Sequence, residues 1–254
     1  MKYWEVKAKA NKTGELLLYG EIASSQFWGD EVTPTQIDAE IKALGEIDTL
    51  NVYINSGGGS VFAGMAIYNI IKRCKASVKN AYVDGLAASI ASVIPMACDK
   101  VFIPSNAVMM IHNPAGAIMG CAEEMRKMAE ILDKLRETIS NVYAEKTGMG
   151  KEELHKMMDE EKWMTAAECL EMGFCDEMQA EVKIAASVDT NFLNFGDVKI
   201  DTSHFKNFKP EIIEIYGEEI QPVIIEDKIP EKTELKLSEQ ENAFRALKIK
   251  LTKI

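Results

Sequence analysis

The stretch LNVYINSGGGS at residues 50–60 decides the fold, because an apolar strand runs directly into three consecutive glycines. The pattern predicts a strand over residues 50–54 and a helix that opens from Ser60. This order of strand, glycine turn and helix is typical of α/β proteins. Consecutive glycines also expose backbone N–H groups without side-chain obstruction, so the turn can hold an oxyanion or a phosphate.

The phosphate alternative is weak for this turn. No lysine followed by serine or threonine comes after the glycines, which excludes a P-loop, and the full G-x-G-x-x-G spacing of a dinucleotide site is missing. An oxyanion-binding turn and a plain tight turn are the interpretations that remain.

Strand and helix patterns alternate on both sides of this unit and predict an α/β fold with a largely parallel sheet. Thr33-Pro34-Thr35-Gln36 has the sequence of a capping box, and Gly45 ends the helix that it begins. Apolar residues three and four apart predict one long helix over 122–146, which can contact a neighbouring subunit as well as the core. A small-residue helix is predicted from Ala87, and strands are predicted at residues 16–22 (in a hairpin with the segment before it), 77–83, 101–103 and 108–111.

The character of the chain changes after about residue 182. Short apolar runs alternate there with Asn, Asp, Lys and Pro, and a second capping box at Ser238 begins a predicted terminal amphipathic helix. We therefore expect a core domain over residues 1–182 and a C-terminal extension over residues 183–254.

The composition excludes several classes of partner. Of the 254 residues, 47% are hydrophobic and 27% charged, and the net charge of −11 leaves no basic surface for nucleic acid or an acidic membrane. The five cysteines contain no C-x-x-C pair, so we expect no zinc site and a reducing compartment. Neither a signal peptide nor an apolar run of membrane-spanning length is present, so we expect a cytoplasmic protein.

Ser89 is the candidate nucleophile. It follows a strand and the turn at Gly85, and it stands among small residues at a predicted helix N-terminus, where peptide dipoles favour developing negative charge. The surrounding sequence is not the G-x-S-x-G elbow of the α/β-hydrolases. Considered alone, Ser89 is better interpreted as a buried serine on a packed helix.

His112 is the candidate base, because a hydroxyl becomes a good nucleophile only when a neighbouring group takes its proton. It ends an apolar strand and precedes a Pro/Gly loop, a position well placed to face a cleft. His155 lies among charged residues and His204 lies in the polar extension, so a solvated surface position is predicted for both.

A carboxylate that orients the imidazole is the third part of such a triad. Asp159, Glu160 and Glu161 are the candidates, and spacing alone does not choose among them. A solvated helix end is the alternative interpretation of this acidic run.

Four ordered motifs resemble the Clp protease proteolytic subunit family. YINSGGGSVFAGMAIY at 53–68 resembles its I-N-S-P-G-G-x-x-x-A-G-x-x-I-Y motif, and residues 85–91 resemble its nucleophile segment G-x-A-A-S-x-G/A. MIHNP at 110–114 resembles its M-I-H-x-P motif, and residues 163–176 resemble F-x-[ST]-A-x-E-A…G-x-x-D. The resemblance implies a peptidase domain over residues 1–182 with a ClpP/crotonase-like spiral of β-β-α units, from which the long helix protrudes.

This resemblance also implies a serine endopeptidase that needs no cofactor or metal. Ser89 would be the nucleophile, His112 the general base, and Glu161 would stand at the position of the family's aspartate. The backbone N–H groups of Gly59 and Ile90 would form the oxyanion hole. An extended protein or peptide substrate would bind by strand addition beside Gly58, Asn113, Pro114, Ala115 and Gly116.

The sequence departs from the family pattern at several points. Gly57 stands where the family has proline, which predicts a looser turn. By comparison with the family, we also expect the chain to lack the N-terminal segment that forms axial loops and binds an ATPase. With the extension, these features are similar to the Clp-related head maturation proteases of tailed phages and prophages, which implies a capsid or scaffold protein as substrate. Homo-oligomeric rings, heptamers or stacked heptamers, are implied too, with the helix at 122–146 between rings.

Three rival functions stay open. A housekeeping Clp subunit fed by an AAA+ ATPase would carry the same motifs. Enoyl-CoA hydratase relatives share the spiral scaffold and bind an oxyanion with glycine-loop N–H groups, but they have no need of a paired serine and histidine. A catalytically inactive ring scaffold would need neither residue.

Overall fold

The computed structural model of the protein describes residues 4–9, 12–26, 31–181, 186–189, 192–195, 198–203 and 205–208. All of them belong to the first of two units of the chain, Met1–Ile220. The boundary expected at residue 182 therefore falls inside this unit, because described segments beyond that residue contact the core. The helix predicted from Ser238 lies outside the described residues.

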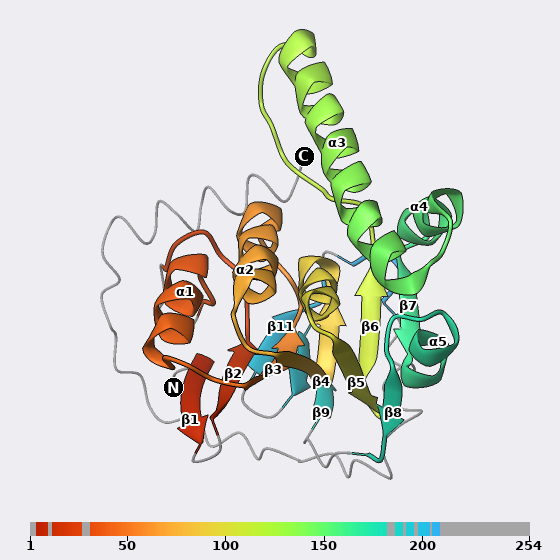
Figure 1. Cartoon of the computed structure of the whole chain (residues 1–254). Coiled ribbons are helices and arrows are strands. Elements are labelled where there is room, and N and C mark those ends of the chain that lie inside the picture. Colours follow the sequence, from red (N-terminus) through yellow and green to blue (C-terminus); the bar gives the residue numbers. More distant parts are fainter. Residues whose placement is uncertain are drawn as a thin grey trace, which may run out of the picture. The chain divides into compact units, whose positions relative to one another are not determined.

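A mostly parallel sheet is the frame of this unit, as the sequence predicted (Figure 1). β1 and β2 form the predicted antiparallel hairpin, and the later neighbours in the order β1-β2-β3-β4-β5-β8 are parallel. β6 also pairs in parallel with β4, and β7 pairs antiparallel with β6. The strands are β1 (Trp4–Lys9), β2 (Thr13–Tyr19), β3 (Thr49–Ser56), β4 (Val78–Ala88), β5 (Lys100–Pro104), β6 (Val108–Ile111), β7 (Lys162–Thr165) and β8 (Glu177–Gln179).

Helices cover one face of the sheet, and their starts follow from local capping. α1 (Pro34–Ala43) begins at the predicted capping box, in which Gln36 Oε1 accepts hydrogen bonds from the Thr33 N–H at 3.1 Å and the Thr33 hydroxyl at 2.7 Å. α2 (Val61–Arg73) begins at Ser60, whose hydroxyl accepts the N–H of Ala63. The short helices α4 (Lys151–Asp159) and α5 (Ala166–Glu171) flank β7.

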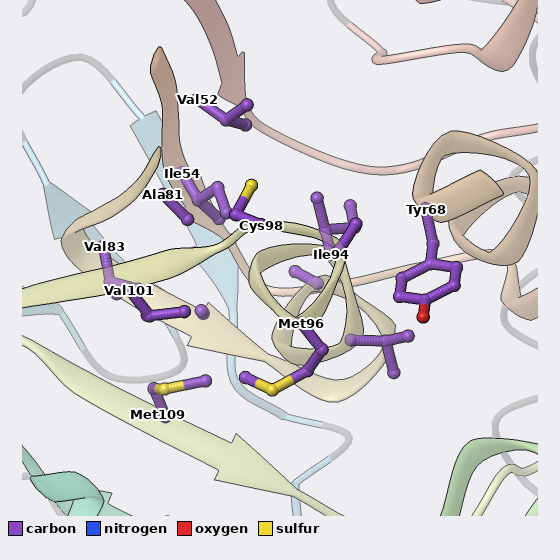
Figure 2. Close-up of a cluster of buried hydrophobic side chains, with 14 of the residues drawn as sticks. Val52, Ile54, Tyr68, Ala81, Val83, Ile94, Met96, Cys98, Val101 and Met109 are labelled. Atoms are coloured by element: carbon purple, nitrogen blue, oxygen red, sulfur yellow. The ribbon is translucent and has the colours of Figure 1, made fainter. Parts of the chain in front are cut away.

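The main core lies between the sheet and these helices. Every second side chain of β2, β3 and β4 points into it, which is the period-2 pattern that the sequence shows. Figure 2 shows part of this cluster, with Val83 and Val101 of the strands on one side, Tyr68 of α2 on the other, and Ile94 of the short helix after β4 between them. Burying each large apolar side chain stabilises the fold by about 1.5–3 kcal/mol.

The segment after β4 corrects one prediction. The small-residue helix expected from Ala87 is wrong in both start and type, because β4 continues to Ala88 and Ser89–Ala97 form a 3-10 helix, η1. Ala87 and Ala88 pair with Met109 and Met110 of β6, and this tertiary pairing outweighs the helix propensity of alanine.

α3 (Ala122–Thr147) is the predicted long helix, and it ends as predicted at Gly148, which has φ 73°. Only its C-terminal half reaches the core, and Figure 1 shows the other half continuing beyond it. Met125 and Ile131 on the projecting half are 50% and 46% exposed. Within the described ranges, none of the helices combines the length and apolar character that crossing a bilayer requires.

Three short strands beyond residue 182 form a second, antiparallel sheet that the sequence analysis missed. They are β9 (Ala186–Asp189), β10 (Phe192–Phe195) and β11 (Val198–Asp201). Leu193 and Ile200 from this sheet, with Phe205 after it, are buried in a second apolar cluster with Leu86, Met110 and Trp163. Strands of four residues are too short for hydrophobic alternation to reveal.

The sheet face opposite the helices carries aromatic and polar side chains. The rings of Tyr53, Tyr82 and Phe102 stack across β3, β4 and β5 with centroids 4.9 Å apart at both steps. The Tyr19 hydroxyl donates a hydrogen bond to the Asp84 carboxylate. Burial raises the pKa of Asp84 above its ordinary value, and the hydrogen bond from Tyr19 offsets this only in part.

We expect Asp84→Asn to stabilise the fold at neutral pH. Because the folded-state pKa of Asp84 lies above the unfolded one, ionising this carboxyl costs folding free energy as pH rises between the two values. Asparagine keeps an acceptor for Tyr19 and carries no charge. Thermal melting of the variant should exceed that of the wild type at pH 8, and the difference should shrink toward zero as pH falls to about 4, the ordinary pKa of aspartate. A difference that does not change with pH would contradict this account.

Candidate active site

Ser89 directly follows β4, near the point where the pairing of β4 with β3 ends. The pairing of β3 with β4 breaks after Ile54↔Val83 and resumes at Ser56↔Ala87, so one residue of β3 faces three of β4. Such a bulge bends a strand and increases its twist, and beyond it the end of β4 pairs with β6. Ser89 follows directly with φ 54°, a left-handed conformation that is uncommon for residues other than glycine.

His112 meets Ser89 because of the register between β4 and β6. Ala88 is opposite Met110, so the residue after β4 and the residue after β6 emerge at the same edge of the sheet. The Nε2 atom of His112 lies 2.7 Å from the Ser89 Oγ, within hydrogen-bond distance. A hydroxyl held against an imidazole in this way is the arrangement of an activated nucleophile.

The glycine turn after β3 lies directly against this pair. Gly58 and Gly59 have φ values of 100° and 140°, which side chains rarely allow. A Cβ on Gly58 would lie 2.6 Å from the Ser89 Cβ and 3.2 Å from the Ile90 nitrogen. The Ser56 hydroxyl shapes the turn, because it accepts the Gly58 N–H at 3.1 Å and donates to the Gly20 carbonyl at 2.5 Å.

Two backbone N–H groups beside Ser89 are available to a ligand. In the described part of the chain, neither the Gly59 N–H nor the Ile90 N–H donates a hydrogen bond. Ile90 is at the start of η1, where the first N–H groups of a helix have no intrahelical acceptor. The two predicted oxyanion donors therefore flank Ser89, and their N–H groups can bind negative charge.

Ser92 and Tyr143 support the site and were not found by sequence reasoning. The Ser92 hydroxyl donates to the Ser89 carbonyl at 2.5 Å and also lies 2.7 Å from the Tyr143 hydroxyl. Because the Ser92 proton is used, the buried Tyr143 must donate to Ser92. Burial raises the pKa of Tyr143, so it stays a neutral donor. These two hydrogen bonds connect Ser89, whose backbone is strained, to Tyr143 of α3. In the sequence, the only indication of this connection was a serine three residues after Ser89.

Asp159 and Glu160 are both exposed. The Asp159 side chain is 54% exposed and binds Arg136 at 2.9 Å and the Asn113 amide at 2.8 Å. The hydrogen bond from Asn113 lowers the pKa of Asp159 most, and Arg136 lowers it further, while burial acts in the opposite direction.

Glu161 is the buried member of the acidic run, at 6% exposed. Continuing the β6–β7 register from Ile111↔Lys162 by one residue sets it opposite His112. Its carboxylate accepts the Lys206 N–H at 2.9 Å, the Asn207 N–H at 2.8 Å and the Trp163 Nε1–H at 3.3 Å. Among the described residues, no hydrogen bond or ion pair joins Glu161 to His112.

The predicted substrate-binding segment after His112 is open. Residues 112–119 belong to no strand or helix of the described chain, and exposure increases from Asn113 and Pro114, which are half-buried, to Ala115 and Gly116, which are exposed. A backbone segment without strand partners next to the pair of Ser89 and His112 is a suitable edge for strand addition.

The other histidines are not part of this site. His155 Nε2 lies 3.1 Å from the Ser140 hydroxyl and 3.2 Å from Glu137, so it is held between α4 and α3 rather than fully solvated as predicted. His204 lies outside the described residues.

Comparison with known proteins supports the family resemblance that the sequence motifs indicated. The Clp protease family model matches residues 10–183. The ATP-dependent Clp protease proteolytic subunits of Streptococcus pneumoniae strains Hungary19A-6 and CGSP14 are each 41% identical over 133 residues, which is 51% of this chain and 67% of theirs. A solved ClpP1 mutant from Listeria monocytogenes aligns with TM-score 0.57 and 28% identity over 67% of this chain and 92% of its own.

The chain therefore belongs to the Clp protease family, and it is a serine-type peptidase with the α/β fold of that family. The predicted family and enzyme class are confirmed. The individual catalytic roles and the closeness to phage enzymes stay predictions. The matched range ends near the start of the second sheet, so β9, β10, β11 and the residues after them lie beyond it.

The backbone strain at Ser89 predicts an unusual order of stability among variants. Ser89→Gly and Ser89→Ala both remove the hydroxyl, but glycine also relieves the left-handed conformation, worth about 1–2 kcal/mol. Against this, glycine adds about 0.4–1 kcal/mol of unfolded-state entropy. Urea unfolding should therefore show Ser89→Gly more stable than Ser89→Ala by about 0.5–1 kcal/mol.

Ser92 offers the matched control for this measurement. It lies inside η1, and unlike Ser89 it does not have a positive φ. Ser92→Gly should therefore be less stable than Ser92→Ala. The same order at both positions would mean that Ser89 carries no strain.

Proposed function

We propose that Ser89, His112 and Glu161 form the catalytic triad of a serine endopeptidase. The observation that carries the proposal is the 2.7 Å contact between Ser89 Oγ and His112 Nε2. In the proposed reaction the Ser89 oxygen attacks a peptide carbonyl while His112 takes the hydroxyl proton. His112 then gives that proton to the leaving amine, and water hydrolyses the acyl-enzyme by the same steps.

The oxyanion of the tetrahedral intermediate would lie between the N–H groups of Gly59 and Ile90, which are aimed at no protein acceptor in the described chain. Removing one such donor typically costs on the order of 10²–10³ in kcat. The substrate backbone would run between Gly58 and residues 113–116. Glu161 would hold the imidazole, and its burial opposite His112 favours it over Asp159 and Glu160.

A fluorophosphonate probe tests these roles, because it phosphonylates only an activated serine. We expect labelling of the wild type at Ser89, identified by peptide mass spectrometry, and none of Ser89→Ala or His112→Ala. Ser105→Ala, in the turn between β5 and β6, should label like the wild type. Labelling that persists in Ser89→Ala would remove the mechanism.

The same assay tests the third member of the triad. Glu161→Gln should slow labelling by on the order of a hundredfold or more, because the imidazole loses the anion that orients it. Asp159→Asn and Glu160→Gln should label at close to the wild-type rate. A large effect of Asp159→Asn with none of Glu161→Gln would reassign the role.

We also propose that the chain forms heptameric rings, single or stacked, and that it matures phage heads by cutting capsid or scaffold protein. The exposed apolar residues on the projecting half of α3 support a contact between rings. The described segments beyond the family match support a specialised role. A housekeeping subunit served by an AAA+ ATPase fits the family equally well.

Reconstitution separates these two roles. The purified protein should process the capsid or scaffold protein encoded beside its gene at discrete sites without ATP. It should not degrade a stable folded protein when a Clp ATPase and ATP are added. ATP-dependent degradation of that folded protein, with no cleavage of the capsid or scaffold protein, would favour the housekeeping role.

A further inference from the structure

The chain after β11 turns back onto the candidate active site. Ser203 N–H binds Asp201 Oδ1 at 2.9 Å, and the Phe205 N–H binds the Thr202 carbonyl at 3.1 Å. These bonds close a turn that brings residues 205–208 against β6 and β7, and we call these four residues the C-terminal clamp. The clamp lies beyond residues 10–183, the range that the family match covers.

Two consecutive backbone N–H groups of the clamp donate hydrogen bonds to the Glu161 carboxylate. Lys206 donates to Oε2 at 2.9 Å and Asn207 donates to Oε1 at 2.8 Å, one donor for each oxygen. A fork of two backbone donors fixes the plane of a carboxylate, and hydrogen bonds to an ionised acceptor are about twice as strong as neutral ones. The Asn207 side chain also donates to the Glu160 carbonyl at 2.7 Å, which ties the clamp to the adjacent residue.

The bonding capacity of this carboxylate leaves room for the imidazole. An ionised carboxylate offers about four acceptor positions. The clamp and Trp163 Nε1 use three of them, two on Oε1 and one on Oε2. The second position on Oε2 stays available to a donor, and the β6–β7 register continued by one residue makes His112 the residue opposite Glu161.

Glu161 needs this external support because its backbone is strained. Its φ is 49°, in the left-handed region, and such a conformation in a residue other than glycine costs on the order of 1–3 kcal/mol unless the surroundings impose it. Phe205 and Phe208 pack against Trp163 with centroids 5.4 Å and 5.2 Å from its indole ring. The clamp therefore packs against the start of β7, directly after Glu161.

The extension also contacts the other two parts of the site. The Phe205 ring lies edge-on to His112 with centroids 6.2 Å apart. Ile200 fills the space beside the glycine turn, since a Cβ on Gly57 would lie 2.5 Å from its Cγ2. Gly57 stands where the family motif has proline, and Ile200 occupies the room that this exchange leaves.

We propose that the C-terminal clamp is a positioning element of the active site, in which the backbone N–H groups of Lys206 and Asn207 orient the Glu161 carboxylate toward His112. The proposal rests on the triad proposed above. It means that the catalytic unit of this chain continues to residue 208, although none of the clamp residues touches substrate.

Proline substitution tests the clamp at a single N–H group. Lys206→Pro removes the donor to Oε2, whereas Lys206→Ala removes the exposed side chain and keeps the donor. In the full-length protein we expect Lys206→Pro to lower kcat for a fluorogenic peptide by on the order of a hundredfold with KM nearly unchanged. Lys206→Ala should match the wild type in both constants.

A second readout does not depend on turnover. Diethyl pyrocarbonate acylates only neutral imidazole, so its rate at His112 against pH, followed by peptide mass spectrometry, gives the pKa of that histidine. A carboxylate held against an imidazole favours the protonated form, so this pKa should be lower in Lys206→Pro than in Lys206→Ala. Ser89 next to His112, and Asp159 connected to it through Asn113, are the same in both variants.

The Asn207→Pro and Asn207→Ala pair repeats the test at the other oxygen if Lys206→Pro does not fold, as judged by thermal melting. Equal kcat values and equal His112 pKa values within a pair would overturn the proposal. A proline variant more active than its alanine control would also overturn it, because the clamp would then be an inhibitory strap. If no variant and no wild type turns over peptide, the peptidase mechanism fails, and the His112 pKa still decides whether the clamp orients Glu161.

Discussion

The parallel pairing of β6 with the last residues of β4 is the constraint on which the site depends. It sets Ala88 opposite Met110, and from this register Ser89 and His112 emerge side by side. β3 is parallel to β4 as well, so the glycine turn that follows β3 arrives at the same edge. Open α/β sheets bind ligands beyond the carboxyl ends of their strands, and three neighbouring strand ends carry the proposed nucleophile, base and oxyanion donors here.

Strain marks two of the three proposed triad residues. Ser89 and Glu161 both have positive φ, and the third such residue other than glycine in the described chain, Lys12, lies in a turn. At Ser89 the conformation is held by the Ser92 hydroxyl and the glycine turn, and at Glu161 by the clamp. In each case the strained backbone lowers the stability of the fold, and it directs the side chain toward the proposed catalytic site.

Most of the frame could be predicted from the sequence, because local rules decide it. The capping box at Thr33, the alternation in β3 and the stop at Gly148 each depend on neighbouring residues only. The motifs also indicated Ser89 and His112 before their contact was known. The extension of β4 to Ala88 could not be read in this way, because it is a product of pairing with a strand twenty residues later.

The third triad position shows the same limit more sharply. Spacing alone did not choose among three adjacent acids, and only the family resemblance indicated Glu161. The fold separates the buried Glu161 from its exposed neighbours. No sequence rule connects Glu161 with the backbone of Lys206 and Asn207, because almost every residue type has a backbone N–H group and the pattern of side chains does not show which one donates. Ile200 and Gly57 are a similar case, visible in sequence only as a glycine in place of the proline of the family motif.

The wide separation of these parts along the chain has a consequence for biosynthesis. A ribosome releases the glycine turn and Ser89 early, the histidine later, the acid later still, and the clamp near the end. Domains generally fold as units while the chain emerges at about 5–20 residues per second. A nascent chain would thus lack the backbone donors to Glu161 until residues 205–208 have left the ribosome.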